Sequence, residues 1–339
     1  MPKKSRSPAP VKQLTSRQLS RWQKEHRRQR IIFVIGSLVI ILIVGILGYG
    51  YFTSQFAPRW QAAIKVNGST FSTQYYVNYL RAVLGNQPKD AGSINSMTRS
   101  VVEKIQDSEL VKQAALNLNI SVSEDDINQA IRDSLIKPEE KDKLSETEIQ
   151  DRIQKFTSNM PFPVDFLKEL ITADIYGKKL QEKLESQVPT QSEQVKLSAI
   201  VVDTDVTATE VSAKLQNNGD FAALSKEYSK DENTKEKGGD MGWVPRGLFP
   251  ELDGVAFSLS KGTPSQPIAT SNGYYILLVT DKKDSSPISD DALQVLKSRA
   301  LTNWLEQARK SNKLENYLVD KARGSVYPTK LNWIVKQLK

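Results

Sequence analysis

Histidine and cysteine, two side chains that often catalyse reactions or hold metals, are nearly absent from this chain. Among its 339 residues there is one histidine, His26, and no cysteine. Zinc sites and covalent catalysis by cysteine or histidine depend on these residue types. We therefore set both chemistries aside and expect neither a metal nor a cofactor.

A glycine-rich run in the middle of the chain is the most distinctive local pattern. Residues 238–247 read GGDMGWVPRG and contain four glycines and one proline. Inside a helix, glycine costs about 1 kcal/mol and proline about 3 kcal/mol. The run is therefore expected to form a turn, a short strand and a second turn, with at least one of Gly238 and Gly239 at positive φ.

The elements around this run predict a small domain over residues 193–283. Residues 195–202 are rich in isoleucine and valine and predict a strand, and the turn at 271–273 is typical of a hairpin. Thr207 is expected to begin one helix with a capping box, and Asp220 to cap the next. A short helix at 252–257 and strands at 267–270 and 274–280 complete the domain. This β-α-α-β-α-β-β order indicates an α+β fold with a mostly antiparallel sheet.

Six blocks of this segment, in this order, resemble the parvulin-type peptidyl-prolyl isomerases. The blocks are residues 195–202 (VKLSAIVV), 219–224 (GDFAAL), 229–231 (SKD), 238–243 (GGDMGW), 256–259 (AFSL) and 273–277 (GYYIL). The resemblance implies a parvulin-like antiparallel sheet with surrounding helices and an activity on X-Pro bonds. These bonds interconvert over tens of seconds or more, slowly enough to limit folding. No covalent intermediate is needed, because the enzyme has only to bind the twisted amide better than the planar forms.

The resemblance also implies three catalytic positions, an acid and two histidines, and the chain departs from the pattern at both histidines. The acid of the family's long loop matches Asp231. Ala199 stands at the first histidine position and Tyr275 at the second. The candidate catalytic residues are therefore Asp231 and Tyr275, and the loss of both histidines puts the activity in question.

Substrate binding in the family uses an apolar wall for the proline ring and a polar residue near the last turn. Leucine replaces the family's phenylalanine at position 252. A second position of the apolar wall matches Phe249 or its neighbour Leu248. The candidate substrate-binding residues are Met241, Leu248, Phe249, Leu252 and Asn272.

Each candidate also has a purely structural interpretation. Asp231 can serve only to stabilise its loop through hydrogen bonds to the local backbone. Met241 and Leu252 can be ordinary core residues, and for Phe257 a core role is the better interpretation. Tyr275 either brings its hydroxyl to the site or fills space.

The net charge of +8 is carried by the N-terminal segment. Residues 1–30 hold ten Lys or Arg and one Glu, whereas the other 309 residues hold 37 basic and 38 acidic ones. Next comes an uncharged run of 22 residues, 31–52, which would extend about 33 Å as a helix and is long enough to cross a bilayer. We expect a basic cytoplasmic tail at 1–30 and a transmembrane signal anchor at 31–53, with the folded domains outside the cytoplasm. A cleaved signal peptide is one alternative and a nucleic-acid-binding tail is another, although positive-inside topology already explains the charges.

Amphipathic helices flank the small domain on both sides. Residues 61–190 are predicted to be an all-α domain after an initial hairpin, and they resemble the N-terminal chaperone domain of SurA-type and PrsA-type foldases at 65–68 (KVNG) and 118–123 (LNISVS). The resemblance implies that residues 288–339 form a C-terminal helical segment that packs on this domain. One continuous helix is expected at 290–310.

These features predict a membrane-anchored, extracytoplasmic protein-folding factor of the parvulin class. Its expected partners are unfolded or newly exported polypeptides with X-Pro bonds and, through one helix, the membrane; nucleic acid is not expected. A catalytically inactive peptide-binding chaperone or scaffold is the alternative, and a structural module with one fixed partner is a third. Residues 324–339 show no clear period and receive no predicted role.

Overall fold

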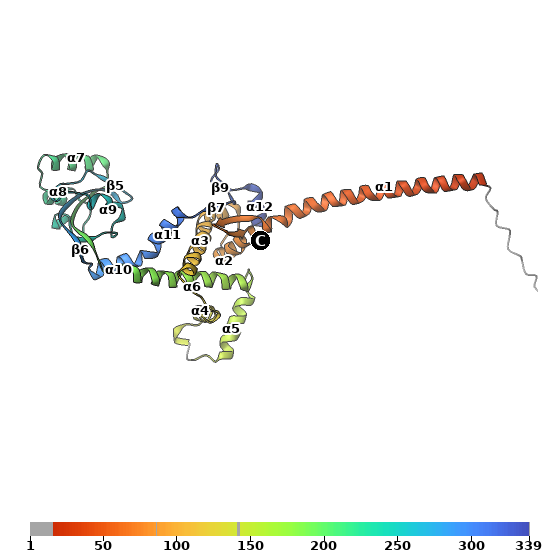
Figure 1. The fold of residues 1–339 in the computed structure, drawn as a ribbon, viewed down its shortest axis with the longest axis horizontal. Helices are drawn as coiled ribbons and strands as arrows, with labels where there is room; N and C mark the ends of the chain where they lie inside the picture. The colour runs from red at the N-terminus through yellow and green to blue at the C-terminus, as the bar shows by residue number, and fades with distance from the viewer. Residues whose placement is uncertain (1–15, 86, 141–142, 339) are drawn as a thin grey trace, which may run out of the picture. The chain divides into compact units, whose positions relative to one another are not determined.

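The computed structural model describes residues 16–85, 87–140 and 143–338 (Figure 1). Residues 1–15 of the predicted basic tail lie outside these described residues. The chain divides into two compact units. One comprises residues 1–65, 70–101 and 316–339, and the other comprises residues 66–69 and 102–315.

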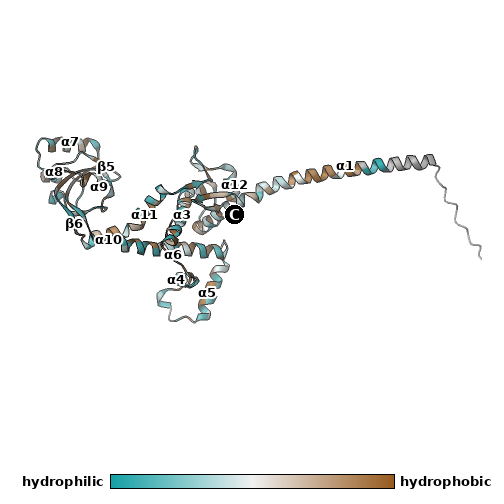
Figure 2. Cartoon of the chain, viewed as in Figure 1, coloured by the Kyte–Doolittle hydropathy of each residue, from teal (hydrophilic) through white to brown (hydrophobic). Residues whose placement is uncertain are grey.

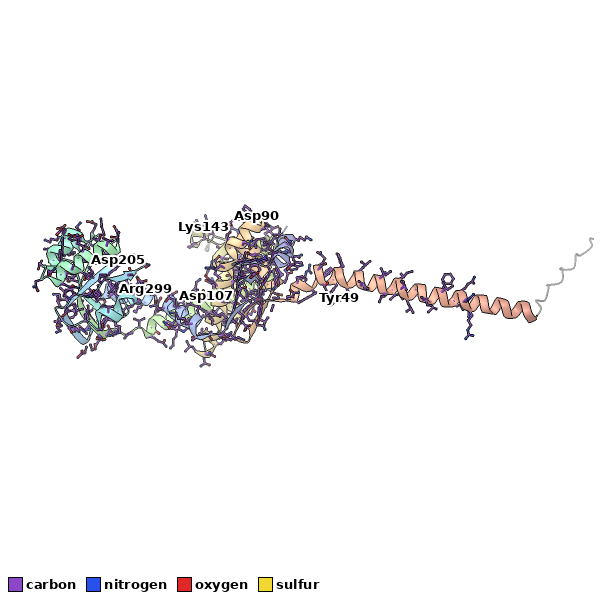
Figure 3. All side chains as sticks on the ribbon, turned by 90° about the horizontal axis from the view of Figure 1, so that it is seen from above. Tyr49, Asp90, Asp107, Lys143, Asp205 and Arg299 are labelled. Carbon is purple, nitrogen blue, oxygen red and sulfur yellow. The ribbon has the colours of Figure 1, made fainter. Side chains whose placement is uncertain are left out.

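The first unit begins with the long helix α1 (Ser16–Gln55). Its part from Arg27 to Gln55 is, by length and composition, the one segment of the described chain that could cross a membrane. The apolar stretch is continuous along the helix (Figure 2), and side chains such as that of Tyr49, which is 72% exposed, project freely from it (Figure 3).

Short elements follow α1, and all of them except β7, whose Leu314 and Glu315 fall in the second unit, belong mainly to the first unit. A small sheet has the strand order β2-β1-β7, and a two-stranded ribbon pairs β8 with β9. The bounds are η1 (Ala57–Trp60), β1 (Ala62–Val66), β2 (Ser69–Ser72), α2 (Thr73–Leu84), β7 (Leu314–Asn316), β8 (Val319–Asp320), β9 (Ser325–Val326) and α12 (Pro328–Leu338), with the first part of α3 (Ala91–Asn117).

A buried tyrosine joins α2 to α3 within this unit. Ser72 caps α2 by accepting the Tyr75 backbone N–H, as Ser and Thr commonly do at helix starts. One turn on, Tyr76 is fully buried, and its hydroxyl is 2.8 Å from Thr98 Oγ1. Burial raises the pKa of Tyr76 to about 12, because the charged phenolate would lose its water.

The helical part of the second unit contains two capping boxes at positions that the sequence marks. Ser123 and Ser145 each accept an N–H from the third residue of their helix, whose carboxylate accepts the serine N–H in return. The helices are α4 (Glu124–Leu135), η2 (Pro138–Glu140), α5 (Glu146–Ser158), α6 (Val164–Gln187), α10 (Asp290–Ser298) and α11 (Ala300–Ser311).

Helix α11 contributes to one apolar cluster with α3 and α6. Trp304 and its neighbours on α11 pack against Ala115 of α3 and Leu180 of α6, both fully buried. The expected continuous helix at 290–310 is wrong, since the chain breaks into α10 and α11 at Arg299. Neither glycine nor proline marks the break, so the local pattern could not predict it.

The second unit also contains the sheet of the small domain, in the strand order β4-β3-β6-β5. All three strand pairings are antiparallel. The elements are β3 (Gln191–Val202), α7 (Asp205–Gln216), α8 (Phe221–Tyr228), η3 (Lys235–Lys237), β4 (Asp240–Pro245), α9 (Pro250–Ala256), β5 (Ile268–Thr270) and β6 (Gly273–Pro287). The predicted order, the α+β class and the antiparallel sheet are confirmed.

Alternation along the central strands gives the sheet two apolar faces. On one face, Ile200 of β3 and Ile276 of β6 are covered by α7 and α8. On the opposite face, Ala199 of β3 and Leu277 of β6 meet Leu252 of α9. Each buried aliphatic side chain contributes about 1.5–3 kcal/mol relative to exposure. The second face carries the candidate site.

Two local predictions within this domain are wrong in detail. Thr207 does not begin α7; Thr204 caps it instead, its hydroxyl accepting the Thr207 N–H at 3.2 Å. The last strand continues past residue 280 to Pro287, because its second half still pairs with the beginning of β3.

Candidate active site

The loop that carries Asp231 is fastened to the central strand β3 at Val201. The Lys230 N–H donates to the Val201 carbonyl at 2.7 Å, and the Val201 N–H donates to the buried Ser229 hydroxyl at 3.2 Å. In the antiparallel register of β3 and β6, Val201 lies opposite Tyr275. The backbone therefore brings Asp231 and Tyr275, 44 positions apart in the sequence, to the same part of the sheet.

Tyr275 is half-buried, and its phenol stays protonated at neutral pH. Burial, together with the negative charges of Asp231 and Glu251, raises the pKa of Tyr275 above its ordinary value. None of the described residues hydrogen-bonds to its hydroxyl. A neutral phenol without an internal partner can donate to a peptide carbonyl that approaches the sheet.

Asp231 already has partners within its own loop. The Thr234 hydroxyl donates to one carboxylate oxygen at 2.6 Å, and the backbone N–H of Asn233 donates to the other at 3.2 Å. These bonds are those of a loop-stabilising aspartate. They hold the carboxylate in place, close enough to Tyr275 for its charge to affect that phenol.

The candidate apolar wall is divided between surface and core. Met241, Leu248 and Phe249 are partly buried and pack against the same cluster as Tyr275. Leu252 is only 4% exposed and lies among the cluster's buried members. The first three can therefore present apolar surface to a ligand, whereas Leu252 supports them from below.

Two consecutive glycines let the turn that precedes β4 and Met241 pack closely, Gly238 against α8 and Gly239 against β3. Gly238 and Gly239 both have positive φ, of 68° and 81°, as expected for this turn. A Cβ at Gly238 would lie 2.6 Å from the Ala222 Cβ, and one at Gly239 would lie 2.4 Å from the Ala199 carbonyl oxygen. The Gly239 carbonyl in turn accepts the Ala199 N–H at 2.9 Å. No side chain fits at either position without moving a neighbour.

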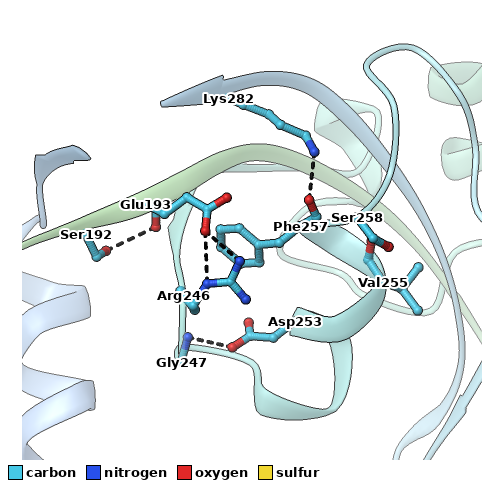
Figure 4. A network of polar contacts seen from close by, with 9 residues as sticks. All are labelled: Ser192, Glu193, Arg246, Gly247, Asp253, Val255, Phe257, Ser258 and Lys282. Carbon is cyan, nitrogen blue, oxygen red and sulfur yellow. Dashed lines mark hydrogen bonds and ion pairs between the residues drawn. The ribbon is translucent and has the colours of Figure 1, made fainter. Parts of the chain in front are cut away.

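A polar network fixes the turn between β4 and α9 that carries Leu248 and Phe249 (Figure 4). The Arg246 guanidinium donates twice to Glu193 of β3, at 3.0 and 2.5 Å, and lies 4.0 Å from the centre of the Phe257 ring. The Asp253 carboxylate accepts the Gly247 N–H at 2.6 Å, which ties the turn to α9. The turn that carries Leu248 and Phe249 is thus bonded both to strand β3 and to helix α9.

Asn272 lies apart from these residues. It is exposed in the β5–β6 turn, where its N–H donates to the Thr270 hydroxyl at 3.1 Å. It is not a member of the apolar cluster that contains Tyr275. Its binding role remains a prediction without a supporting contact among the described residues.

The structure adds residues that sequence reasoning missed. Glu251 lies close enough to Tyr275 to affect its pKa, and Ile268 of β5 pairs directly with Tyr275. The Arg299 guanidinium donates to the Leu248 carbonyl at 2.9 Å. Glu251 directly precedes Leu252 and could have been noted as an acid beside the wall, but nothing in the sequence signals the other two contacts.

This arrangement defines a class of protein. A four-stranded antiparallel sheet carries a phenol and an apolar wall on one face, with Asp231 and Glu251 close enough to affect the phenol, in the β-α-α-β-α-β-β order of the parvulins. Such a site suits the binding of a peptide around a rotatable bond, which needs positioned polar groups and no covalent intermediate.

Family comparison agrees with this class. Residues 197–281 match the family described as PPIC-type PPIASE domain, and residues 20–155 match the family described as SurA-like N-terminal domain. The chain therefore combines a parvulin-family peptidyl-prolyl isomerase domain with a SurA-like N-terminal domain.

Individual relatives are foldases. The chain is 24% identical over 245 residues to foldase protein PrsA of Geobacillus sp. (strain WCH70), and this alignment covers 67% of this chain and 88% of the relative. It is 42% identical over 98 residues to foldase protein PrsA 3 of Bacillus anthracis, which covers 29% of this chain and 35% of the relative. The chain thus spans only about a third of the length of the second relative.

Similar solved structures include the crystal structure of peptidylprolyl isomerase (PrsA) from Bacillus anthracis, with 23% identity and a TM-score of 0.37 over 69% of this chain and 94% of that one. The solution structure of the parvulin domain of PpiD from E. coli has 36% identity and a TM-score of 0.26 over 28% of this chain and 93% of that one.

Proposed function

We propose that this protein is a membrane-anchored foldase that binds exported, unfolded polypeptides and accelerates their X-Pro isomerisation at the face carrying Tyr275. The observation that supports this proposal is the placement of Asp231 beside Tyr275 by the Val201 backbone, next to a partly exposed apolar wall. Met241, Leu248 and Phe249 receive the proline ring. The Tyr275 hydroxyl donates to the carbonyl whose amide loses resonance as it twists.

An exchange assay on an X-Pro peptide tests the catalytic part. Wild-type protein should raise the cis–trans exchange rate above that of the free peptide, and Asp231→Ala should lower the effect. Equal rates for wild type, variant and peptide alone would leave only peptide binding.

Peptide binding without catalysis is the second candidate function, and two observations favour it. Ala199 supplies no polar group at the first family histidine position, and both carboxylate oxygens of Asp231 already accept hydrogen bonds from the loop. Suppression of aggregation of an unrelated unfolded client, with no effect on X-Pro exchange, would support this function.

We also propose that α1 anchors the chain with residues 1–30 in the cytoplasm and the folded units outside. The basic segment before the apolar run supports this orientation. Because the chain contains no cysteine, single substitutions Ser5→Cys and Ser271→Cys can report topology directly. In intact cells, a membrane-impermeant maleimide should label Cys at 271 and spare Cys at 5; the reverse pattern would refute the orientation.

A further inference from the structure

The two compact units have opposite charges. The part of the first unit beyond the apolar run contains ten Lys or Arg and two Asp or Glu. This part comprises residues 53–65, 70–101 and 316–339. The second unit contains 27 basic and 36 acidic residues. Among the described residues of the first unit, only Arg323 forms an ion pair, with Asp320. Apart from Arg323, the basic side chains that the structure describes in this unit therefore have no carboxylate counterion within it.

A cavity of about 420 Å³ opens in this unit between the end of α1 and α12. The two elements lie side by side (Figure 1). The Trp333 indole N–H of α12 donates to the Gln55 carbonyl at the end of α1 at 2.8 Å. Lys330 and Lys336 contribute to the lining, and no acidic residue does among the described residues. The cavity is therefore built to attract an anion.

The lysines of this cavity have donors to spare. The Lys330 ammonium donates to the Tyr317 carbonyl at 2.5 Å, which uses one of its three hydrogens. Burial lowers the pKa of Lys330, because the charged ammonium loses part of its hydration. A bound anion would stabilise the charged form and offset this loss of hydration. Lys336 is exposed and forms no ion pair with the described residues. Arg59, next to the lining residue Pro58, has a buried Nε with no partner in the described chain.

The cavity begins where the apolar run ends. Phe52 is the last residue of that run and Thr53 is the first lining residue, so at 1.5 Å per residue the opening lies within about one helical turn of the hydrocarbon boundary. Phe52 stacks on Phe56 and on Trp60, each with ring centres 6.2 Å apart, and Trp60 is 67% exposed. Exposed aromatic residues at such a boundary are typical of the headgroup layer.

We infer that the cavity between α1 and α12 binds the headgroup of an anionic phospholipid, such as phosphatidylglycerol, in the membrane that α1 crosses. The inference rests on the proposed anchoring by α1. The phosphodiester lies between the ammonium groups of Lys330 and Lys336, and the aromatic stack lies among the neighbouring headgroups. Binding docks the basic unit on the membrane surface, with α12 as its contact element.

Native mass spectrometry of the full-length protein in detergent, with phosphatidylglycerol or phosphatidylcholine added, tests the inference. Wild-type protein should retain phosphatidylglycerol in preference to phosphatidylcholine. Because one lysine near a lipid surface is worth roughly a fivefold change in binding, Lys336→Gln should reduce retention about fivefold and Lys336→Glu further. Lys321→Gln and Lys321→Glu are the matched controls, since Lys321 is exposed in the same unit but does not line the cavity.

Retention that is equal for the two lipids, or that falls as much at Lys321 as at Lys336, would overturn the inference. The measurement is separate from the exchange assay and from maleimide labelling. A protein that passes both of those tests but shows no lipid preference loses only the headgroup site.

Discussion

Three glycines of the isomerase-family domain should respond to alanine substitution in three different ways. Gly239 and Gly242 have nearly equal positive φ, 81° and 75°. A Cβ at Gly239 would lie 2.4 Å from the Ala199 carbonyl oxygen, whereas one at Gly242 would meet nothing within 4 Å. Gly254 lies within α9 at ordinary helical φ, also with open space around it. The series separates backbone strain from steric contact.

The magnitudes follow from these surroundings. Placing an alanine in the left-handed region costs about 1–2 kcal/mol, which is the whole effect expected for Gly242→Ala. Gly239→Ala adds the displacement of β3, about 1–3 kcal/mol by analogy with overpacked cores. Gly254→Ala should instead stabilise α9 by about 0.5–1 kcal/mol, because alanine loses less conformational entropy there.

Amide hydrogen exchange in the full chain, read on the peptide covering residues 195–202, measures these differences locally. Each 1.4 kcal/mol corresponds to a tenfold change in the opening equilibrium. Gly242→Ala should speed exchange about 5- to 30-fold, and Gly239→Ala by a further factor of at least about five. Equal exchange in these two variants would refute the conclusion that the Ala199 carbonyl requires glycine at 239.

Three further predictions concern the candidate site and the first unit. Tyr275→Phe should lower catalysed X-Pro exchange about fivefold while thermal unfolding stays unchanged, because it removes one hydrogen-bond donor worth about 1 kcal/mol. Arg246→Met should lower the free energy of unfolding by about 1 kcal/mol, measured by urea denaturation, since it removes a half-exposed ion pair and the contact with Phe257. The stability that the buried phenol of Tyr76 confers should be complete below pH 10 and lost as pH rises from about 10 to about 12, an interval that near-UV circular dichroism and tyrosinate absorbance can follow.

Each of these has a control. Lys261→Met removes the exposed ion pair with Asp281 without touching a ring, so it should change stability less than Arg246→Met does. For the alkaline transition, Tyr76→Phe should flatten the dependence between pH 10 and 12. An unchanged transition in that variant would assign it to other groups, and an unchanged exchange rate for Tyr275→Phe would make Tyr275 a space-filling residue.

Local chemistry made much of the fold predictable. Asp220 caps α8, and Ser123 and Ser145 cap their helices. Short polar side chains favour such positions because they accept hydrogen bonds from the free N–H groups at a helix start. The glycine pair at 238 and 239 predicted its own backbone, since few other residues adopt that φ.

Tertiary contacts decided what could not be predicted. The break at Arg299 coincides with the bond from its guanidinium to the Leu248 carbonyl, far away in the sequence. Residues 325–326 form a ribbon strand and residues 328–338 form α12, in which the buried Trp333 donates to the Gln55 carbonyl at the end of α1. A pattern of 11 residues is too short to reveal a helix that is fixed by such partners.

For the site, family resemblance supplied the positions, and the register of β3 and β6 supplied their proximity. Asp231 and Tyr275 lie near each other because the loop before Asp231 is bonded to Val201, which pairs with Tyr275, a relation that no spacing in the sequence contains. Leu252 is buried, which a one-dimensional match to a wall position could not reveal. The binding roles of these residues remain predictions.

Methyl NMR of the full-length protein with a proline peptide tests the central claim most directly. The chain contains four methionines, so methionine-methyl labelling gives few signals, and Met241 is the only one of the four in the proposed site. Addition of an X-Pro peptide should shift the Met241 methyl signal, and the same peptide with alanine in place of proline should shift it much less. An unmoved Met241 signal at saturating X-Pro peptide, or equal shifts with both peptides, would contradict a proline-binding site on this face.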